Sequence, residues 1–157
     1  MTTRDVDAMS DTVDEIEQQL LVALRRVRRV AREAAEKVHP GLEAAAYAFL
    51  VRLDAIGPSR PSDLAAYFHI GKATAGRQLA ALEQLGLVTR QPDPEDGRAH
   101  LLDLTPDGRR RLSACRADRH RTLRERLSGW SEDDLTVLAG LLIRLNNDDT
   151  EQSLPGR

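Results

Sequence analysis

Apolar side chains recur every three or four residues over much of the chain, which is the spacing of one face of an α-helix. The longest stripe predicts a helix over about 12–38, which the turn residues His39–Gly41 end. A second stripe predicts a helix over about 42–56, which ends at Gly57. The two stripes consist of Ile16, Leu20, Leu24, Val27, Ala31, Ala35 and Val38, and of Leu42, Ala46, Phe49, Leu50 and Leu53.

Two shorter helices are expected next, separated by a turn at 69–71. Pro61 suits the first turn of a helix over about 61–68, because its missing N–H is not needed there. A helix over about 72–85 follows, and Gly86 suits its C-terminal cap. Their inward sides are expected to carry Leu64, Ala65 and Phe68, and Ala75, Leu79, Leu82 and Leu85.

After Gly86 the helical spacing gives way to short extended segments. Residues 87–91 and 100–104 are predicted to form two strands, because a polar segment rich in Pro and Asp separates them. A β-hairpin with a long polar tip is therefore expected over 87–104.

Two further helices complete the pattern. Thr105 caps a helix that continues to about Leu127 and has a thin, arginine-rich apolar stripe. Ser131 caps a last helix with a leucine stripe over 135–145. This stripe and the one over 12–38 offer more apolar surface than the small domain formed by the remaining elements can bury, so a dimer interface explains them better than an intrachain core.

A helix, a three-residue turn, a second helix and a strand pair, in this order, indicate a winged helix-turn-helix. The expected fold class is mainly α with a small β-hairpin wing (α+β), with long N- and C-terminal dimerisation helices. We expect an acidic flexible arm over 1–11 and a polar tail over 147–157. Between them, the dimerisation region is assigned to 12–41 and 106–146, and the DNA-binding domain to 42–105.

The helix over 72–85 leaves polar side chains outward, of the types that contact base edges in the major groove. Arg98, at the hairpin tip, is placed to enter a narrow minor groove. Considered singly, Arg77 and Gln78 are better explained as exposed helix residues, and only their arrangement together with the wing motif favours DNA contact. The expected major-groove set is Lys72, Thr74, Arg77 and Gln78, and Lys72 and Arg90 are expected to contact phosphates.

Composition narrows the kinds of partner. Lys plus Arg is 23 and Asp plus Glu is 25, so the net charge of −2 excludes a uniformly basic nucleic-acid coat. The charge is segregated, since 1–18 hold one basic and six acidic residues, 21–39 six basic and two acidic, and 131–157 two basic and six acidic. DNA binding would therefore depend on where a few arginines point, and on base and shape readout.

Other kinds of chemistry have little support in the sequence. A single cysteine, Cys115, makes no intrachain disulfide, and the histidines show no metal-ligand spacing. A glycine-rich phosphate loop and a nucleophile elbow are absent from the sequence, so we expect no enzyme, no cofactor and no metal. The start of the chain resembles neither a secretory signal nor a transit peptide, and no apolar stretch reaches about 20 residues, so a cytoplasmic protein without a membrane partner is expected.

Three motifs within 62–108 resemble the MarR family of transcriptional regulators, and the arrangement of elements extends the resemblance over roughly 12–146. The motifs are Asp63-Leu64-Ala65 followed by Lys72-Ala73-Thr74-Ala75-Gly76-Arg77; Leu82-Glu83-Gln84-Leu85-Gly86-Leu87-Val88-Thr89-Arg90; and Asp93-Pro94-Glu95-Asp96-Gly97-Arg98 followed by Leu104-Thr105 and Gly108. The resemblance implies a homodimer that binds double-stranded DNA at a palindromic operator, acts as a repressor and is released by a small-molecule effector.

The same resemblance implies roles for individual residues. Thr74, Arg77 and Gln78 fall on recognition-helix positions, and Arg98 falls on the wing arginine. Asp96 falls on the wing aspartate that holds that arginine, or the recognition-helix arginine, in place. In this family small aromatic or phenolic effectors often bind between the dimerisation helices and the winged domain, and the side chains expected to line such a pocket are Arg25, Arg28, His39 and Tyr47.

The sequence departs from the family pattern at the helix-turn-helix itself. His69 stands where glycine is usual, which predicts strain or a shifted turn. Ala75 replaces a larger β-branched residue, and Arg60 and Gly71 replace the usual Ser or Thr caps. An alternative function is a helical dimeric protein-interaction or redox-sensing module with weak DNA affinity, in which Cys115 is the sensor; packing explains that cysteine better.

Overall fold

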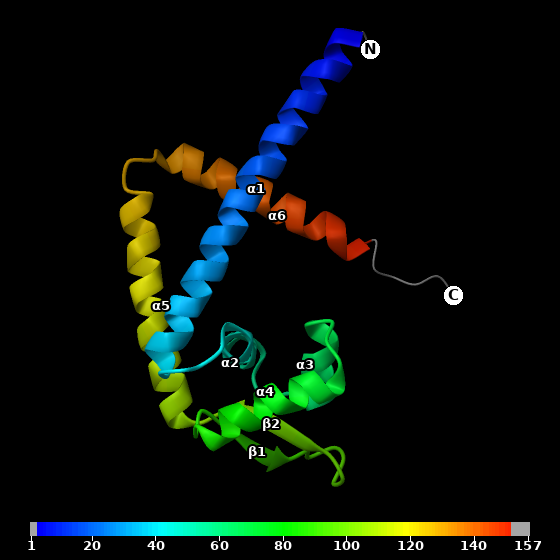
Figure 1. The fold of residues 1–157 in the computed structure, drawn as a ribbon, viewed down its shortest axis with the longest axis vertical. Helices are drawn as coiled ribbons and strands as arrows, with labels where there is room; N and C mark the ends of the chain where they lie inside the picture. The colour runs from blue at the N-terminus through cyan, green and yellow to red at the C-terminus, as the bar shows by residue number, and fades with distance from the viewer. Residues whose placement is uncertain (1–2, 152–157) are drawn as a thin grey trace, which may run out of the picture. The chain divides into compact units, whose positions relative to one another are not determined.

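In the computed structural model of the chain, residues 3–151 are described, with side chains over 9–147 (Figure 1). The chain divides into two compact units, Met1–Ala117 and Asp118–Arg157. Within the described residues the elements are α1 (Thr3–Val38), α2 (Ala44–Ile56), α3 (Pro61–Tyr67), α4 (Lys72–Gln84), β1 (Val88–Pro92), β2 (His100–Leu104), α5 (Pro106–Arg126) and α6 (Glu132–Glu151). The order matches the expected winged helix-turn-helix, and the fold class is mainly α with one two-stranded antiparallel hairpin.

The two ends of the chain differ from expectation. The arm expected over 1–11 is helical from Thr3, because Met9 and Val13 continue the spacing of the apolar stripe and no Gly or Pro interrupts it. The polar tail expected over 147–157 is helical to Glu151, since Asn and Asp lower helix propensity by only about 0.7 kcal/mol or less each. The rest of that expected tail lies outside the described residues.

The turn between α3 and α4 takes the strain that the sequence predicts. His69 has a φ of 51°, in the left-handed region that favours glycine. The Ile70 N–H donates to the Ala65 carbonyl at 3.1 Å and the His69 N–H to the Ala66 carbonyl at 3.1 Å, which closes the end of α3 as a Schellman motif does. Backbone hydrogen bonds therefore hold a histidine where a glycine would fit without strain.

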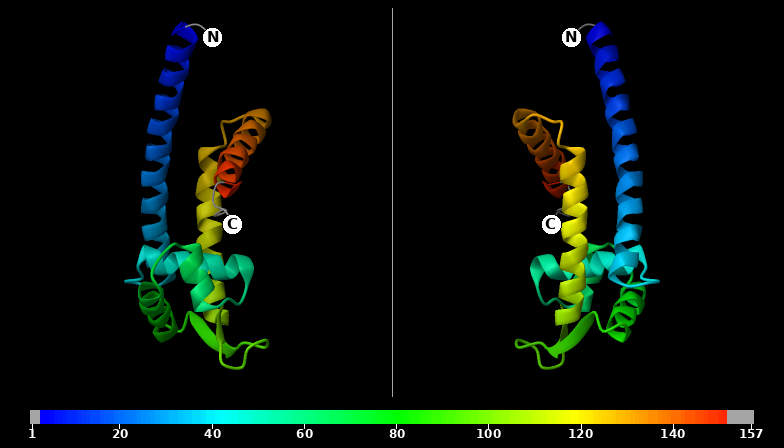
Figure 2. Two further views of the ribbon diagram at one scale, coloured as in Figure 1. Left: turned by 90° about the vertical axis from the view of Figure 1, so that its right-hand side faces the viewer. Right: turned by 90° about the vertical axis from the view of Figure 1, so that its left-hand side faces the viewer.

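The hairpin is the wing. Its strands pair in one register from Val88 opposite Leu104 to Pro92 opposite His100. Ser59, just before α3, adds a bridge to β2, because its N–H donates to the Leu102 carbonyl at 3.0 Å and its carbonyl accepts from the Leu102 N–H at 2.9 Å. Figure 2 shows the loop between the strands projecting beyond the rest of the winged part.

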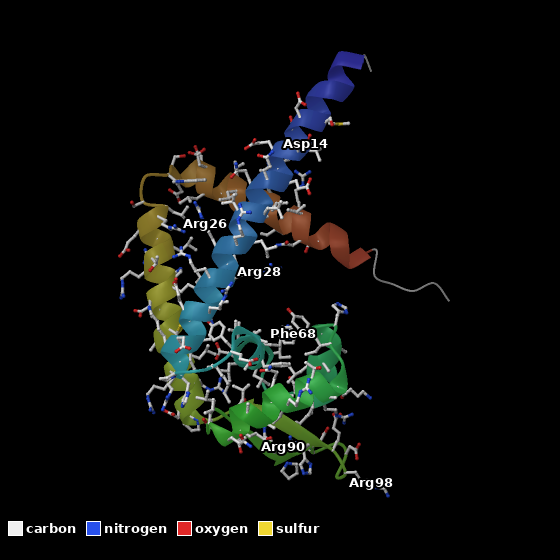
Figure 3. All side chains as sticks on the ribbon, viewed as in Figure 1. Asp14, Arg26, Arg28, Phe68, Arg90 and Arg98 are labelled. Atoms are coloured by element: carbon white, nitrogen blue, oxygen red, sulfur yellow. The ribbon has the colours of Figure 1, made fainter. Side chains whose placement is uncertain are left out.

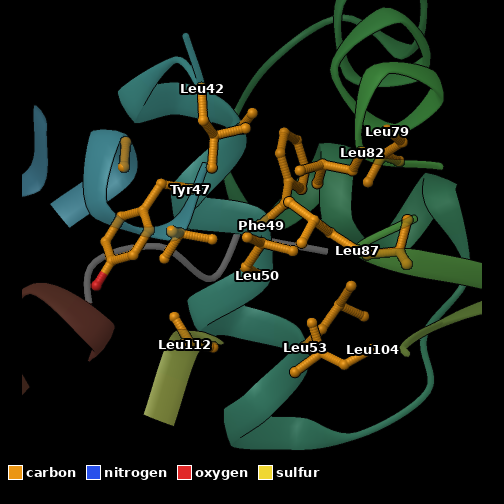
Figure 4. Packing of buried hydrophobic residues seen from close by; sticks show 14 of the residues in the cluster. Leu42, Tyr47, Phe49, Leu50, Leu53, Leu79, Leu82, Leu87, Leu104 and Leu112 are labelled. Carbon is orange, nitrogen blue, oxygen red and sulfur yellow. The ribbon is translucent and has the colours of Figure 1, made fainter. Parts of the chain in front are cut away.

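One buried core joins the helix-turn-helix to the wing and to the carboxyl-terminal turns of α1 (Figure 4). Leu53, Leu79 and Leu82 are fully buried and come from α2 and α4. Phe49 meets Phe68 edge to face, with ring centroids 4.9 Å apart. The core also contains Ala34, Ala35, Val38, Leu42, Ala46, Tyr47, Leu50, Leu64, Ala65, Ala75, Leu87, Val88, Leu102, Leu104, Leu112 and Cys115.

The start of α5 is fixed against the start of the hairpin. The Thr105 hydroxyl donates to the Gly86 carbonyl at 2.6 Å and accepts the Gly108 N–H at 3.0 Å. A Cβ on Gly108 would lie 2.1 Å from the Leu87 carbonyl oxygen, so only glycine allows this approach. The Leu-Thr and Gly of the third motif are thus structural, since they dock the helix after the wing.

The second unit contains α6 and the carboxyl-terminal end of α5. Ser131 caps α6 as expected, because its hydroxyl accepts the Asp134 N–H at 3.1 Å. In the leucine stripe of α6, Leu141, Leu142 and Leu145 are 52%, 44% and 47% exposed within the single chain. Among the described residues, helices that combine the length and apolar character needed to span a membrane are absent.

Candidate nucleic-acid interface

The exposed face of α4 carries the expected arginine. Ala75, Leu79 and Leu82 are buried and define the inward side of the helix. With 3.6 residues per turn, Arg77 lies almost opposite this side, and it is exposed. Its Nη2 lies 3.5 Å from the Thr74 hydroxyl, so these two side chains form one polar patch.

Lys72 and Gly76 flank this patch without obstructing it. Lys72 is exposed at the first position of α4. A recognition helix contacts the groove with this amino-terminal end. A Cβ added at Gly76 would meet nothing within 4 Å, so the surface beside Arg77 is open.

Gln78 is placed differently from the other predicted α4 residues. It is half-buried beside the inward stripe, and its Nε2 donates to Glu43 Oε2 at 2.8 Å. Glu43 is the residue before α2. One amide N–H of Gln78 is therefore engaged by a carboxylate that the sequence analysis did not select, and 35 residues separate the two, so helical periodicity gave no signal of it.

The wing tip presents Arg98 to solvent, as Figure 3 shows. Asp96 Oδ1 accepts the backbone N–H of Arg98 at 3.0 Å, and the Asp96 carbonyl accepts the Ala99 N–H at 2.8 Å. Asp96 thus shapes the backbone that carries Arg98. The resemblance had suggested that it holds an arginine in place, and the contact runs through the main chain.

An ion pair between Arg60 and the buried carboxylate of Asp93, at the base of the wing, was not predicted from the sequence. The Asp93 side chain is 4% exposed, and its Oδ2 accepts from Arg60 Nε at 2.7 Å and lies 2.6 Å from Arg60 Nη2. The Glu95 N–H, then Arg60 and the Asp96 N–H, hold the pKa of Asp93 below its ordinary value, although burial acts in the opposite direction. The hydrogen bond and charge of Asp93 raise the pKa of Arg60.

A cleft of about 360 Å³ lies between the start of α3 and the hairpin. Its lining gathers several basic side chains and a hydroxyl from segments far apart in the sequence: Arg60, Pro61, Ser62, Arg90, Arg98, Ala99 and His100. Arg90, the predicted phosphate contact, is partly neutralised, because its Nε lies 2.8 Å from Glu83 Oε1. Arg60 is likewise paired with Asp93, so Arg98 and the Ser62 hydroxyl are the lining groups best suited to an anion such as a phosphate.

The four residues expected to line an effector pocket are not brought together within one subunit. Arg25 and Arg28 are exposed on α1, whereas Tyr47 is buried in the core. His39 Nδ1 lies 2.7 Å from the Pro40 carbonyl oxygen. Arg25 and His39 are 14 residues apart, which is about 21 Å along the helix that holds Arg25, so a single small aromatic molecule does not reach both.

Cys115 is packed as a small core residue. It is buried, and its Sγ lies 3.6 Å from the Ala34 carbonyl oxygen on α1. Burial limits access of oxidants to the thiol, which disfavours the redox-sensing alternative. In the part of the chain that the structure describes, clusters of three or more His, Cys, Asp or Glu side chains able to hold a metal ion are absent.

Comparisons with known proteins agree with this geometry. The MarR family model matches residues 42–100. The chain is 36% identical over 134 residues, 85% of its length, to an uncharacterized HTH-type transcriptional regulator, YxaD, of Bacillus subtilis (strain 168), and the match covers 92% of that relative. It is also 32% identical over 92 residues, 57% of the chain and 64% of the relative, to the uncharacterized HTH-type transcriptional regulator ML2140 of Mycobacterium leprae (strain TN).

Solved structures share the fold at lower sequence identity. A MarR family protein from Bacillus stearothermophilus has a TM-score of 0.80 at 21% identity, with 90% of this chain and 97% of that chain covered. Streptococcus pneumoniae FabT in complex with DNA has a TM-score of 0.78 at 17% identity, with 90% and 99% covered. These similarities support the winged-helix fold.

Proposed function

The chain belongs to the MarR family of transcriptional regulators, and from this premise we propose that it binds a palindromic DNA operator as a homodimer and represses transcription. The observation that carries the proposal is that Arg77 on α4 and Arg98 on the wing are both exposed, on elements that share one buried core. Two arginines held on different elements of one compact unit can contact two grooves of the same duplex.

The major-groove contacts follow from side-chain chemistry. Arg77 presents a planar fork that matches the O6 and N7 acceptors of guanine, and the Thr74 hydroxyl and methyl contact the neighbouring base. Gln78 uses its carbonyl oxygen and its second amide N–H on adenine, since Glu43 takes only one of its two donors. Lys72 contacts the backbone at the start of α4.

The wing supplies minor-groove and phosphate contacts. Arg98 enters the minor groove, and Asp96 supports it by shaping the tip. Arg90 and the cleft beside α3 contact the phosphates that flank the groove. The net charge of −2 gives little hold on random DNA, so specificity rests on these few positions.

The homodimer rests on apolar surface that a single chain leaves exposed. In α1, Val13, Ile16 and Val27 are 56%, 51% and 63% exposed, and they belong to one stripe. Large apolar patches of this kind mark interfaces, and a two-fold dimer mirrors a palindromic site. The other exposed apolar residues of α1 and α6 are Met9, Leu20, Leu21, Leu24, Val137, Leu141, Leu142, Ile143 and Leu145.

Regulation is proposed by analogy with the family. A small aromatic or phenolic effector releases the dimer from DNA by changing the spacing of the two recognition helices, because each must meet a half-site about one helical turn from the other. A regulator of this kind acts in the cytoplasm, where its DNA is. The acidic chain ends and the exposed apolar helices also favour a second candidate, a protein-interaction module with weak DNA affinity.

A salt titration separates the two candidates. Fragments selected from the parent genome are tested by gel shift between about 50 and 200 mM salt, with wild type, Arg98→Ala and Arg26→Ala. We expect specific binding with a steep salt slope, and a loss of about 10-fold or more in affinity for Arg98→Ala. Arg26 is exposed on α1, away from the wing in Figure 3, and is the matched control.

Absence of any preferred fragment at every salt concentration would exclude the regulator in favour of the interaction module. Equal affinities of wild type and Arg98→Ala would remove the wing arginine from the interface.

A further inference from the structure

The wing tip is tied to the helix-turn-helix at one buried carboxylate. The two oxygens of Asp93 have different partners, because Oδ1 accepts the Glu95 N–H at 2.9 Å and Oδ2 takes both Arg60 contacts. The Asp93 N–H also donates to the Ala99 carbonyl at 3.1 Å, which closes the base of the tip. One side of the carboxylate therefore organises the tip, and the other side fixes it to a residue outside the hairpin.

Arg60 is itself held by its backbone. Its carbonyl accepts the Asp63 N–H at 3.1 Å and the Leu64 N–H at 3.2 Å, so it is the N-cap of α3. The preceding Ser59 is bridged to β2 through two backbone hydrogen bonds. Because the backbone of Arg60 is fixed at the start of α3, its guanidinium fixes the position of Asp93 relative to α3.

The contacts run in series from Arg60 to the wing arginine. Arg60 holds Asp93, Asp93 fixes the backbone N–H of Glu95, and Asp96 accepts the N–H of Arg98. We propose that Arg60 is a positioning residue for Arg98: it sets the direction of the wing tip relative to the recognition helix. The proposal rests on the proposed DNA-binding function and names a residue that governs it.

The physical benefit is preorganisation. An untethered tip would sample many directions, and ordering it on DNA would cost conformational entropy that reduces affinity. Arginine suits the task because its Nε and Nη2 reach the same carboxylate together and its rigid guanidinium fixes their angle. A lysine keeps the charge with one donor group, so it would hold the tip less firmly.

The test is a double-mutant cycle between Arg60→Gln and Arg98→Ala, read by DNA affinity on the fragment that wild type prefers. We expect Arg60→Gln to weaken binding about 10-fold in the presence of Arg98 and less than 2-fold when Arg98 is already alanine. Arg60→Lys should recover part of the loss. Arg109→Gln is the matched control, since Arg109 also pairs with two carboxylates, of Asp54 and Asp103, and lies outside the wing tip.

Full additivity of the two losses would overturn the proposal, because Arg60 would then act on DNA by itself. An unchanged affinity of Arg60→Gln would overturn it as well. Amide hydrogen exchange without DNA gives a second measurement, in which Arg60→Gln should speed exchange at Glu95 and Arg98 while Arg109→Gln leaves both unchanged. If wild type binds no fragment, the proposed function fails, and unchanged exchange at these amides separately refutes the tether.

Discussion

The winged part and the amino-terminal half of α1 differ in the burial of their apolar side chains. In the winged part, Leu53, Leu79 and Leu102 are fully buried within one chain. In α1, Leu20 and Leu24 belong to an equally regular stripe and are each 43% exposed. A stripe of the right period thus predicts a buried face, but one chain supplies the covering surface only for the first region, and a second copy is proposed to supply it for the other.

The same contrast holds for polar side chains. In the winged part, arginines are fixed by carboxylates, as Arg60 is by Asp93 and Arg90 by Glu83. In α1, Arg29 meets Glu33 at 3.4 Å with both side chains more than half exposed, a pair worth about 0.5 kcal/mol or less. In the winged part, polar and apolar contacts both join different elements, and such contacts fix the relative positions that a DNA-binding surface needs.

The largest expected effect is a loss of stability of the winged part when the docking of α5 against it is disrupted. Gly108→Ala places a Cβ within 2.1 Å of the Leu87 carbonyl oxygen, so the wing and α5 must separate. We expect the free energy of unfolding to fall by about 3 kcal/mol in urea denaturation. Gly76→Ala, in an open helical position, is the control and should raise it by about 0.5–1 kcal/mol. A Gly108→Ala protein as stable as wild type would refute the docking role.

The next effect concerns self-association through the exposed apolar stripe of α1. Leu20→Glu combined with Leu24→Glu puts two charges into the exposed stripe of α1 and should weaken self-association by roughly 100-fold, measured by sedimentation. The matched control, Gln18→Glu with Arg26→Glu, changes exposed positions on another side of the same helix. Equal dimer affinities of the two double variants would show that the stripe is not the interface.

A smaller effect concerns the DNA sequence preference of α4 in the winged part. Gln78→Ala removes one base contact, so we expect a shift in preference at one base pair worth about 1–3 kcal/mol, with little change in the salt slope. Selection from randomised operators measures this shift. Gln84→Ala, at the carboxyl-terminal end of α4, is the control. If both variants select the wild-type site, Gln78 serves only to bind Glu43.

The smallest effect is the response of the wing to pH. The folded pKa of Asp93 is lowered, so its contribution to stability is complete above the unfolded value of about 3.9 and is lost as pH falls through the lower folded value. Wing amide exchange should therefore be independent of Asp93 ionisation from pH 5 to 8. Carbon NMR of the Asp93 carboxyl should give a midpoint below 3.9, and a midpoint above it would contradict the tether.

Much of the fold was predictable because its signals are local. Period, caps and turn residues predicted the four elements from α2 to β1, and β2, to within a few residues. The residue type of His69 predicted the strained backbone of its turn. The amino-terminal extension of α1 was not predicted, because an acidic segment is typical of a solvated arm as well as of a helix. The four residues predicted for an effector pocket do not meet within one chain, since helical rise separates Arg25 from His39, and the pocket stays a prediction.

The sequence by itself determined the winged helix-turn-helix, the family and the exposure of Arg77 and Arg98, because these follow from periodicity and from motifs of fixed spacing. Only the tertiary structure decided which charges are engaged. Arg60 and Asp93 are 33 residues apart, and Gln78 and Glu43 are 35 apart, so their contacts depend on how the hairpin and α2 pack around the core. Local patterns fix directions along one element, whereas a pair between elements exists only once the core has brought them together.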